Sequence, residues 1–240
     1  MNKKKVFFSK SYSGLVKIKS DFFYENCSYL KKAKKEYKIY SKQKKRIKCK
    51  NCENKISKPV FVSHGIDYCI CKKCGHLNGI YEDGDNFVKH LYHNNKGRNY
   101  TKHYKKFFTE RVKNIYLPKV NFLKNVIKEK FDVIDFGCGA GYFLKACENK
   151  GIKAYGYDVN KSLLHQANKY LKKNTANYLD QRNMYTLIKK TNCKVLSLIS
   201  TLEHLQEPNR LLESVKNSNI KYIFFNVPLF SLSVFIENVF

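Results

Sequence analysis

A glycine-rich turn between a predicted strand and a predicted helix decides the fold: Val133–Tyr142 reads VIDFGCGAGY. Its apolar start is typical of a buried strand, and Gly137, Gly139 and Gly141 follow at alternate positions. Glycine has no Cβ atom and tolerates positive φ, so a ligand can approach this backbone closely. The free N–H groups of the helix that follows can bind an anionic group such as a carboxylate. The stretch therefore predicts a ligand-binding turn.

An acidic residue at the end of the next predicted strand completes the pattern. Asp158 lies nineteen residues after Gly139 and can accept hydrogen bonds from both hydroxyls of a ribose. A dinucleotide-binding fingerprint requires a third glycine where this chain has Tyr142, so a dinucleotide is not favoured. Asp135 suits a cationic amino group better than a pyrophosphate. S-adenosylmethionine carries an ammonium, a carboxylate, a ribose and an adenine, and it fits the whole set; the alternative is an ordinary turn with a chance acidic residue.

The C-terminal half of the chain alternates short apolar runs with amphipathic helical stretches. Asn160 can cap one of these helices, and Gly151 can end another in the left-handed conformation. The predicted strands are 131–136, 153–157, 195–200 and 220–227. Such alternation predicts an α/β fold, a Rossmann-like and mostly parallel sheet with helices on both faces.

These motifs make the chain similar to class I S-adenosylmethionine-dependent methyltransferases over about residues 131–230. The resemblance implies that Asp135 and the three glycines of the turn hold the aminocarboxypropyl end of the cofactor, and that Asp158 holds its ribose. It also implies that Val159 packs on the adenine and that Ser200 lies beside the methionyl part. The edge of the adenine would meet a contact after the third strand of the family, which we place at residues 180–183.

A Glu-His pair follows the predicted strand 195–200, at a place where many members of this family carry one. His204 could act as a general base, because its ordinary pKa lies near neutrality, and Glu203 could orient it or contact the substrate. The alternative, which we favour, is that His204 packs under the cofactor and makes a structural hydrogen bond. Methyl transfer is an in-line displacement that depends largely on positioning, so a base is needed only when the acceptor must lose a proton.

Two Cys-x-x-Cys pairs lie upstream of this domain, Cys49 with Cys52 and Cys71 with Cys74. Each pair forms a knuckle whose sulfurs point to one side, and two knuckles supply the four thiolates of a tetrahedral structural zinc site. Four protein ligands leave no open coordination position for catalysis. The alternative is a set of free or redox-active thiols. Cys69 and His76 lie next to these pairs and are expected to be structural. The other cysteines are expected to be small buried residues, namely Cys27, Cys138, Cys147 and Cys193.

The chain is strongly basic, with 47 Lys and Arg against 19 Asp and Glu and a net charge of +28. Half of this excess lies in residues 1–50, but Lys outnumbers Arg 42 to 5. Because phosphate-reading surfaces usually favour the bidentate fork of Arg, a nucleic-acid partner is possible but not favoured. Part of the charge also has a local explanation. Four lysines flank the cysteine pairs and would offset the negative charge of a zinc tetrathiolate, namely Lys48, Lys50, Lys72 and Lys73.

No targeting or membrane-spanning segment is predicted. The apolar run after the basic start is only three residues long, and the apolar stretch Tyr222–Phe240 is interrupted by polar residues. Nine cysteines without a secretory signal predict a reducing compartment and a cytoplasmic location. The predicted organisation is a basic helical segment at 1–47, a zinc ribbon at 48–80, a helical connector at 81–130 and the cofactor-binding domain at 131–240.

Motifs around the cysteines and in the connector carry a second resemblance. His64–Tyr68, Gly75–Gly79 and Asn114–Lys119 make the chain similar to bacterial methyltransferases with an N-terminal zinc-binding segment, which are often associated with surface-polysaccharide or modified-sugar synthesis. This resemblance implies S-adenosylmethionine and a structural Zn²⁺ as cofactors. It implies a small-molecule acceptor, a sugar or nucleotide-sugar methylated at O, C or N. The alternatives are an RNA methyltransferase and an inactive zinc-binding fragment.

The sheet of class I methyltransferases usually continues with two further strands after the one predicted at 220–227. This chain ends at Phe240, so we expect a C-terminally incomplete domain that binds cofactor weakly on its own.

Overall fold

The computed structural model of the chain describes residues 22–63, 65–94 and 107–227. Backbone contacts divide it into two units, which we describe separately. The described parts of Lys96–Leu202 and Glu213–Asn226 form the first unit, and those of Asp21–Asn95 and Glu203–Leu212 lie in the second. The start of the predicted basic segment 1–47 lies outside the described residues, and the four-segment organisation stays a prediction.

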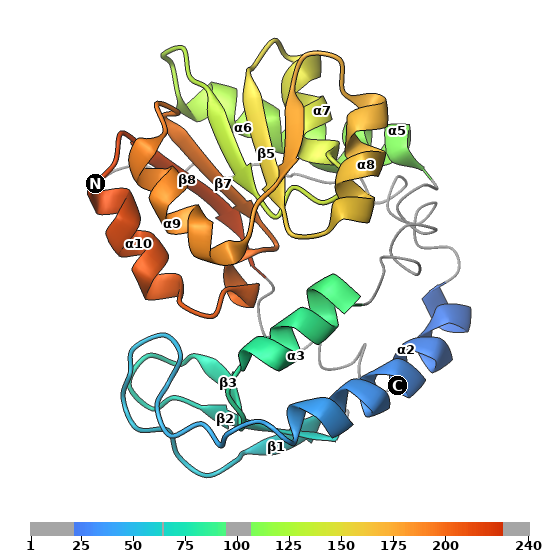
Figure 1. Cartoon of the computed structure of the whole chain (residues 1–240), viewed down its shortest axis with the longest axis vertical. Coiled ribbons are helices and arrows are strands. Elements are labelled where there is room, and N and C mark those ends of the chain that lie inside the picture. The colour runs from blue at the N-terminus through green and yellow to red at the C-terminus, as the bar shows by residue number, and fades with distance from the viewer. Residues whose placement is uncertain (1–21, 64, 95–106, 228–240) are drawn as a thin grey trace. The chain divides into compact units, whose positions relative to one another are not determined.

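The first unit is built on a parallel sheet of five strands in the order β6-β5-β4-β7-β8 (Figure 1). The strands are β4 Val133–Phe136, β5 Ala154–Asp158, β6 Thr175–Tyr178, β7 Val195–Ile199 and β8 Tyr222–Asn226. Every residue of the central strand β4 is buried; three of its four residues are apolar, as expected for a strand covered on both faces, and the fourth is Asp135. The predicted Rossmann-like, mostly parallel α/β fold is therefore confirmed.

Helices cover both faces of this sheet. They are α5 Phe108–Arg111, η2 Val112–Tyr116, α6 Leu117–Val126, α7 Tyr142–Asn149, α8 Lys161–Tyr170, α9 Gln181–Lys190 and α10 Pro208–Lys216. Only the part of α10 from Glu213 onward belongs to this unit. Right-handed crossovers place α7 and α8 on one face and α9 and α10 on the other, and Figure 1 shows α9 and α10 nearer the viewer than the sheet. Helix α9 and the edge strand β6 were not predicted from the sequence.

Local signals set the bounds of the helices next to the turn. The side chain of Asn160 accepts hydrogen bonds from the N–H groups of Ser162 and Leu163, both at 3.1 Å, so it caps α8 as predicted. Gly151 follows α7 with a φ of +69°, the left-handed conformation that ends many helices. Gly151 thus marks where the chain turns from α7 back toward β5, and Asn160 marks where it leaves β5 and enters α8.

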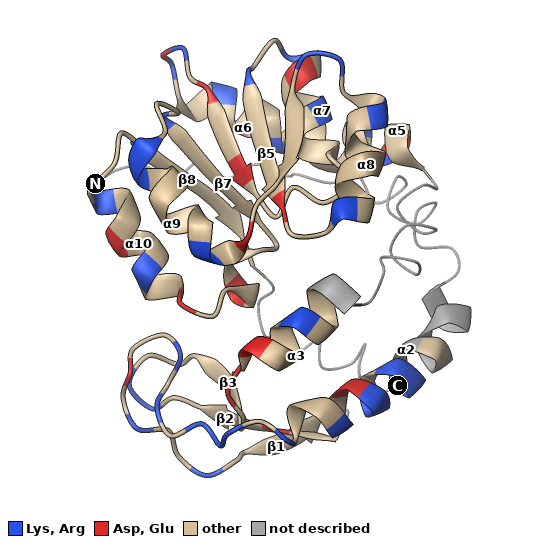
Figure 2. Cartoon of the chain, viewed as in Figure 1, with Lys and Arg blue, Asp and Glu red and all other residues tan. Residues whose placement is uncertain are grey.

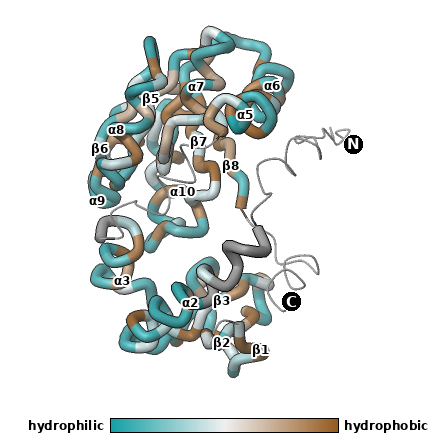
Figure 3. Tube along the Cα trace, turned by 90° about the vertical axis from the view of Figure 1, so that its right-hand side faces the viewer, coloured by the Kyte–Doolittle hydropathy of each residue, from teal (hydrophilic) through white to brown (hydrophobic). Residues whose placement is uncertain are grey.

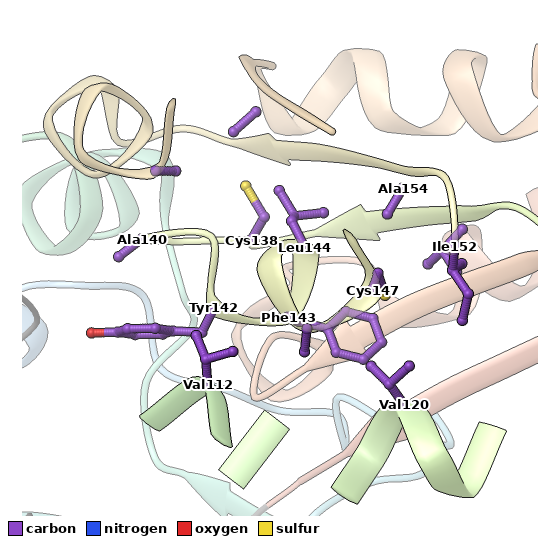
Figure 4. Close-up of a cluster of buried hydrophobic side chains, with 14 of the residues drawn as sticks. Val112, Val120, Cys138, Ala140, Tyr142, Phe143, Leu144, Cys147, Ile152 and Ala154 are labelled. Carbon is purple, nitrogen blue, oxygen red and sulfur yellow. The ribbon is translucent and has the colours of Figure 1, made fainter. Parts of the chain in front are cut away.

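The core of the first unit lies between α7, the sheet and the connector helices (Figure 4). Leu144 and Phe143 of α7 are buried, and Val112 and Val120 of the connector pack in the same cluster. At Gly156 of β5 an added Cβ would lie 2.3 Å from Leu144 Cδ1. Helix α7 therefore packs directly on the backbone of β5, which fixes the position of the glycine turn at its start.

The second unit contains a small antiparallel sheet and helices. Its elements are α2 Phe22–Tyr40, β1 Phe61–Ser63, β2 Ile66–Ile70, β3 Leu77–Gly79, α3 Asp85–Lys89, η1 His90–Asn94 and part of the turn η3 Leu202–His204. Tyr40 joins α2 to this sheet, because its hydroxyl donates to Tyr81 O at 2.6 Å and accepts from Tyr81 N at 3.1 Å. Its ring also packs against Phe87, with 5.0 Å between centroids.

Hydropathy varies along the chain. Figure 3 shows hydrophobic residues along β7 and β8, whereas the coloured part of α2 is largely hydrophilic. Within the described residues, no helix combines the length and apolar character that a membrane span requires.

Candidate functional site

The glycine turn after β4 has the positive φ angles that its sequence predicts. Gly137, Gly139 and Gly141 have φ angles of +70°, +53° and +80°, in the region that favours glycine. An added Cβ at Gly137 would lie 2.2 Å from Thr201 Oγ1, and one at Gly141 would lie 2.8 Å from Ala167 Cβ. At Gly139 the nearest atom would be a Leu163 methyl at 4.0 Å. Two glycines therefore allow close packing, while Gly139 faces open space that a ligand can enter.

Asp158 lies beside this turn, as the sequence predicts. Its Oδ2 accepts a hydrogen bond from Gly139 N at 2.8 Å, and its Oδ1 accepts one from Asn160 N at 2.8 Å. Each carboxylate oxygen has a second lone pair, so both can still accept from a ligand hydroxyl. Val159 follows and is half-buried. The turn and the carboxylate therefore form one continuous site.

Asp135 lies in β4 below the turn and is only 2% exposed. Its Oδ1 has no hydrogen-bond partner among the described residues. Burial raises the pKa of Asp135 to about 7; Ser197, its neighbour across the β4–β7 pair, opposes the rise, and the charge of Asp158 adds to it. A buried acceptor without a partner fits a cationic ligand group, and an ammonium beside it would favour the ionised carboxylate.

Two further predicted contacts lie at the same carboxyl edge of the sheet. Ser200 follows β7 with a φ of +52° and is exposed. Its N–H donates to Asn226 O at 3.0 Å and to Asn226 Oδ1 at 3.1 Å, which ties it to β8. In the stretch 180–183, Asp180 accepts from Arg182 N at 2.9 Å and caps α9. The roles of these residues toward a ligand stay predictions.

The Glu-His pair belongs to the second unit. His204 Nδ1 lies 2.7 Å from the hydroxyl of Tyr92, and the two rings meet edge to face at 5.5 Å. Half of the His204 side chain is exposed, at 51%, and its Nε2 lies 3.8 Å from Glu203 Oε1. Packing around the ring lowers the pKa of His204, against the opposite effect of Glu203. No sequence signal indicated Tyr92, because it lies 112 residues away.

The four predicted metal ligands come together in the second unit. The thiol sulfurs of Cys49, Cys52, Cys71 and Cys74 all lie within 4.8 Å of one another. Cys49 Sγ is 3.6 Å from Cys74 Sγ, and Cys52 Sγ is 3.5 Å from Cys71 Sγ. Tetrahedral zinc with bonds of about 2.3 Å requires sulfurs about 3.8 Å apart. The cluster therefore has the residue types and the spacing of a closed four-cysteine metal site.

N–H groups surround these sulfurs. Asn51 N and Asn78 Nδ2 lie 3.4 and 3.5 Å from Cys49 Sγ, and Asn54 Nδ2 lies 3.4 Å from Cys52 Sγ. The backbone N–H of Asn54 is the main cause that lowers the pKa of Cys52 to about 6. Such donors stabilise thiolates.

One of the lysines that flank the cysteine pairs has an acidic partner of its own. Lys50 pairs with Asp83, at 2.7 Å, and Arg46 shares the same carboxylate at 3.2 Å. Asp83 therefore offsets part of the positive charge near the cluster. Charge compensation of the four thiolates by the flanking lysines stays a prediction.

The buried cysteines of the first unit are as predicted. Cys138, Cys147 and Cys193 are buried and form no disulfide. In the second unit Cys69 is also buried. The side chain of Cys27 lies outside the described residues.

Comparison with known proteins gives the class of the chain. Residues 106–233, more than half of the sequence, match the family described as a methyltransferase domain. The chain therefore belongs to this methyltransferase domain family, which confirms the prediction of a methyltransferase at the level of the family. No curated protein sequence matches the chain.

Several solved structures resemble part of the chain. An S-adenosylmethionine-dependent methyltransferase from Archaeoglobus fulgidus is 24% identical, with a TM-score of 0.42, over 56% of this chain and 63% of that one. An amino pentose methyltransferase from Micromonospora echinaspora is 14% identical, with a TM-score of 0.43, over 55% and 57%. A TehB-like methyltransferase from Corynebacterium glutamicum is 15% identical, with a TM-score of 0.46, over 60% and 80%. The chain thus spans less than two thirds of the length of the first two.

Proposed function

We propose that the first unit binds S-adenosylmethionine and that the protein transfers its methyl group to an acceptor. The observation that carries this proposal is the contact between Gly139 and Asp158 at 2.8 Å, on a turn whose middle glycine faces open space. A carboxylate that already accepts backbone hydrogen bonds is held in one orientation, which suits recognition of a ribose diol. The bound cofactor would supply an electrophilic methyl group.

Residues around the turn would bind the remaining parts of the cofactor. Asp135 would pair with its ammonium, and the first N–H groups of α7, which begins at Tyr142, would bind its carboxylate. Val159 would pack on the adenine, and Ser200 would lie beside the methionyl chain. The three glycines would form the turn that holds the aminocarboxypropyl end of the cofactor. Fixing both reactants is the main contribution that the protein makes to an in-line displacement.

The binding proposal is tested by isothermal titration with S-adenosylhomocysteine. We expect Asp158→Ala to weaken binding by at least about tenfold, because two ribose hydrogen bonds of about 1 kcal/mol each are lost. Asp132→Asn removes a carboxylate just before β4, away from the glycine turn that follows this strand; it is the control and should bind like the wild type. Equal affinity of Asp158→Ala and the wild type would contradict the site. A full chain that binds no cofactor at all would favour the inactive-fragment alternative.

For His204 we propose a structural role, supported by its hydrogen bond and ring contact with Tyr92. A base would be required only for an acceptor that must lose a proton, and Glu203 would then orient the ring. His204→Gln keeps a hydrogen-bonding side chain and should retain most of the turnover in a methyl-transfer assay. A loss of about 100-fold or more, with cofactor affinity unchanged, would instead assign His204 as the general base.

We propose a sugar or nucleotide-sugar as the acceptor, on the strength of the sequence motifs around the cysteine pairs. The chain carries only 5 Arg residues, and Figure 2 shows Lys and Arg distributed over both units. This pattern does not favour a dedicated nucleic-acid-binding surface.

The acceptor proposal is tested by incubating labelled cofactor with nucleotide-sugars and, separately, with bulk RNA. Salt-sensitive labelling of RNA alone would replace the sugar proposal by the RNA alternative.

We propose Zn²⁺ as the metal of the four-cysteine site, in a structural role. The sulfur spacing and the surrounding N–H donors support this proposal. Metal analysis of the purified chain should find one zinc ion per chain, and Cys71→Ser should lose it. Cys193→Ser, which changes a buried cysteine of the first unit, should keep it. A wild-type chain free of metal after purification without chelators, and unable to take up added zinc, would support free thiols instead.

A further inference from the structure

The side chain of Asn78 lies between the two cysteine knuckles. It is only 3% exposed, and it occupies the middle of strand β3, just after the second knuckle. Its Oδ1 accepts from Lys50 N at 2.9 Å, inside the first knuckle. Its Nδ2 donates to His76 O at 3.0 Å and lies 3.5 Å from Cys49 Sγ. One buried amide therefore contacts the first knuckle, one of the four sulfurs and, just after the second knuckle, the carbonyl of His76.

The orientation of this amide is fixed by its partners. Lys50 N can only donate and His76 O can only accept, so the reverse orientation would place an NH₂ group against an N–H and an oxygen against a carbonyl. His76 O also accepts from Cys71 N at 2.9 Å. The donor that points to Cys49 is thus held in place by the backbone of the second knuckle.

We propose that Asn78 is a positioning residue for the metal of the four-cysteine site, which holds the Cys49 thiolate by an N–H···S hydrogen bond and locks the two knuckles in register. The inference rests on the proposed metal site. A hydrogen bond to a thiolate ligand lowers its negative charge and fixes its direction, and such outer contacts typically change metal affinity by about 10–100-fold. Asn54 contacts Cys52 in a similar way but reaches only its own knuckle.

The test is the rate at which the zinc-loaded full chain gives up its metal to a colorimetric chelator. Asn78→Asp keeps an oxygen that accepts from Lys50 N but replaces the donor to sulfur by a second oxygen. We expect it to release zinc at least about tenfold faster than the wild type. Asn86→Asp adds the same charge to an exposed position of α3 in the same unit and should release zinc at the wild-type rate.

A second measurement separates the hydrogen bond from a general loss of structure. In the cobalt-loaded chain, loss of the N–H donor makes the sulfur richer in electrons, so the sulfur-to-cobalt charge-transfer band should move to lower energy in Asn78→Asp. Wild-type release rates and an unshifted band in that variant would overturn the role of Asn78. A wild-type chain that takes up neither zinc nor cobalt would overturn the metal site itself and the inference with it.

Discussion

Two acidic residues of the first unit, Asp135 and Glu148, have pKa values far from their ordinary range, and that of Asp135 is raised. Asp135 is buried without a partner for Oδ1 among the described residues, and its pKa is raised to about 7. A buried acid that ionises with difficulty destabilises the empty protein at neutral pH. The same acid can stabilise a bound ammonium. The burial that destabilises Asp135 would therefore also serve its proposed role in cofactor binding.

We predict a pH-dependent stability for Asp135→Asn. Below pH 4 the carboxyl is protonated in both the folded and the unfolded chain, so its burial has little effect. Between pH 4 and pH 7 the unfolded chain ionises first, and the wild type loses stability. The variant lacks this loss. Its stability relative to the wild type should rise by about 2–3 kcal/mol between pH 5 and pH 8, measured by urea unfolding. A difference that stays constant with pH would contradict the raised pKa.

Glu148 shows the opposite behaviour. Its side chain is 7% exposed and pairs with Lys145. One oxygen accepts from the N–H groups of Lys172, Lys173 and Asn174 at 2.8, 2.7 and 3.1 Å. Burial alone would raise its pKa, but these contacts together lower it to about 2. The residue thereby attaches the end of α7 to the loop before β6.

We predict that Glu148→Gln lowers the free energy of unfolding by about 2–3 kcal/mol at pH 7. This contribution is present above the ordinary glutamate pKa of 4.5 and is lost as the pH falls toward 2. The difference from the wild type should therefore shrink in acid. Glu213→Gln removes an exposed pair with Lys216, at 2.7 Å and 65% side-chain exposure, and should change stability by less than about 0.5 kcal/mol. Equal effects of both variants would refute the role of Glu148.

Among the elements, α7 links the core to the glycine turn. Leu144 is fully buried, at 0% exposure, and its side chain fills the space that a Cβ at Gly156 of β5 would occupy. We predict that Leu144→Ala lowers the free energy of unfolding by about 2–5 kcal/mol in a thermal or chemical melt, because it leaves a cavity. Leu212→Ala changes a leucine of α10 that is 41% exposed and should have a small effect. Similar losses for both would contradict this packing.

The elements that the sequence predicts are those with a strong local signal. Strands β4, β5, β7 and β8 are all recognised from their apolar runs, and Asn160 and Gly151 mark helix ends in the structure as in the sequence. The sequence does not predict the edge strand β6, because only Ala176 of its four residues is buried and the strand has no apolar run. The contacts of Tyr92 and Asn78 arise from tertiary folding across distant segments, so no local pattern could reveal them.

At the scale of the whole molecule, the chain combines two units with different sources of stability. The first has a hydrophobic core around its parallel sheet, whereas the second has a three-stranded sheet and a four-cysteine cluster. Small domains commonly need a metal to fold, and binding energy then becomes folding energy.

We therefore predict that zinc removal affects the units differently. After treatment with a chelator, hydrogen exchange should speed up strongly in residues 45–81 and change little in β4, β5 and β7. Zinc added back should restore the protection. Uniform loss of protection along the whole chain would contradict separate cores, and no loss at all would contradict a stabilising role of the proposed zinc.

In the proposed function, the turn after β4 and the carboxylate of Asp158 together form the cofactor site. The most direct measurement is a crystal structure of the chain with S-adenosylhomocysteine. It should show the ribose hydroxyls within hydrogen-bond distance of Asp158 and the amino acid end over Gly139, with its ammonium facing Asp135. A ligand bound elsewhere, with this turn and carboxylate left in contact with solvent alone, would contradict the account.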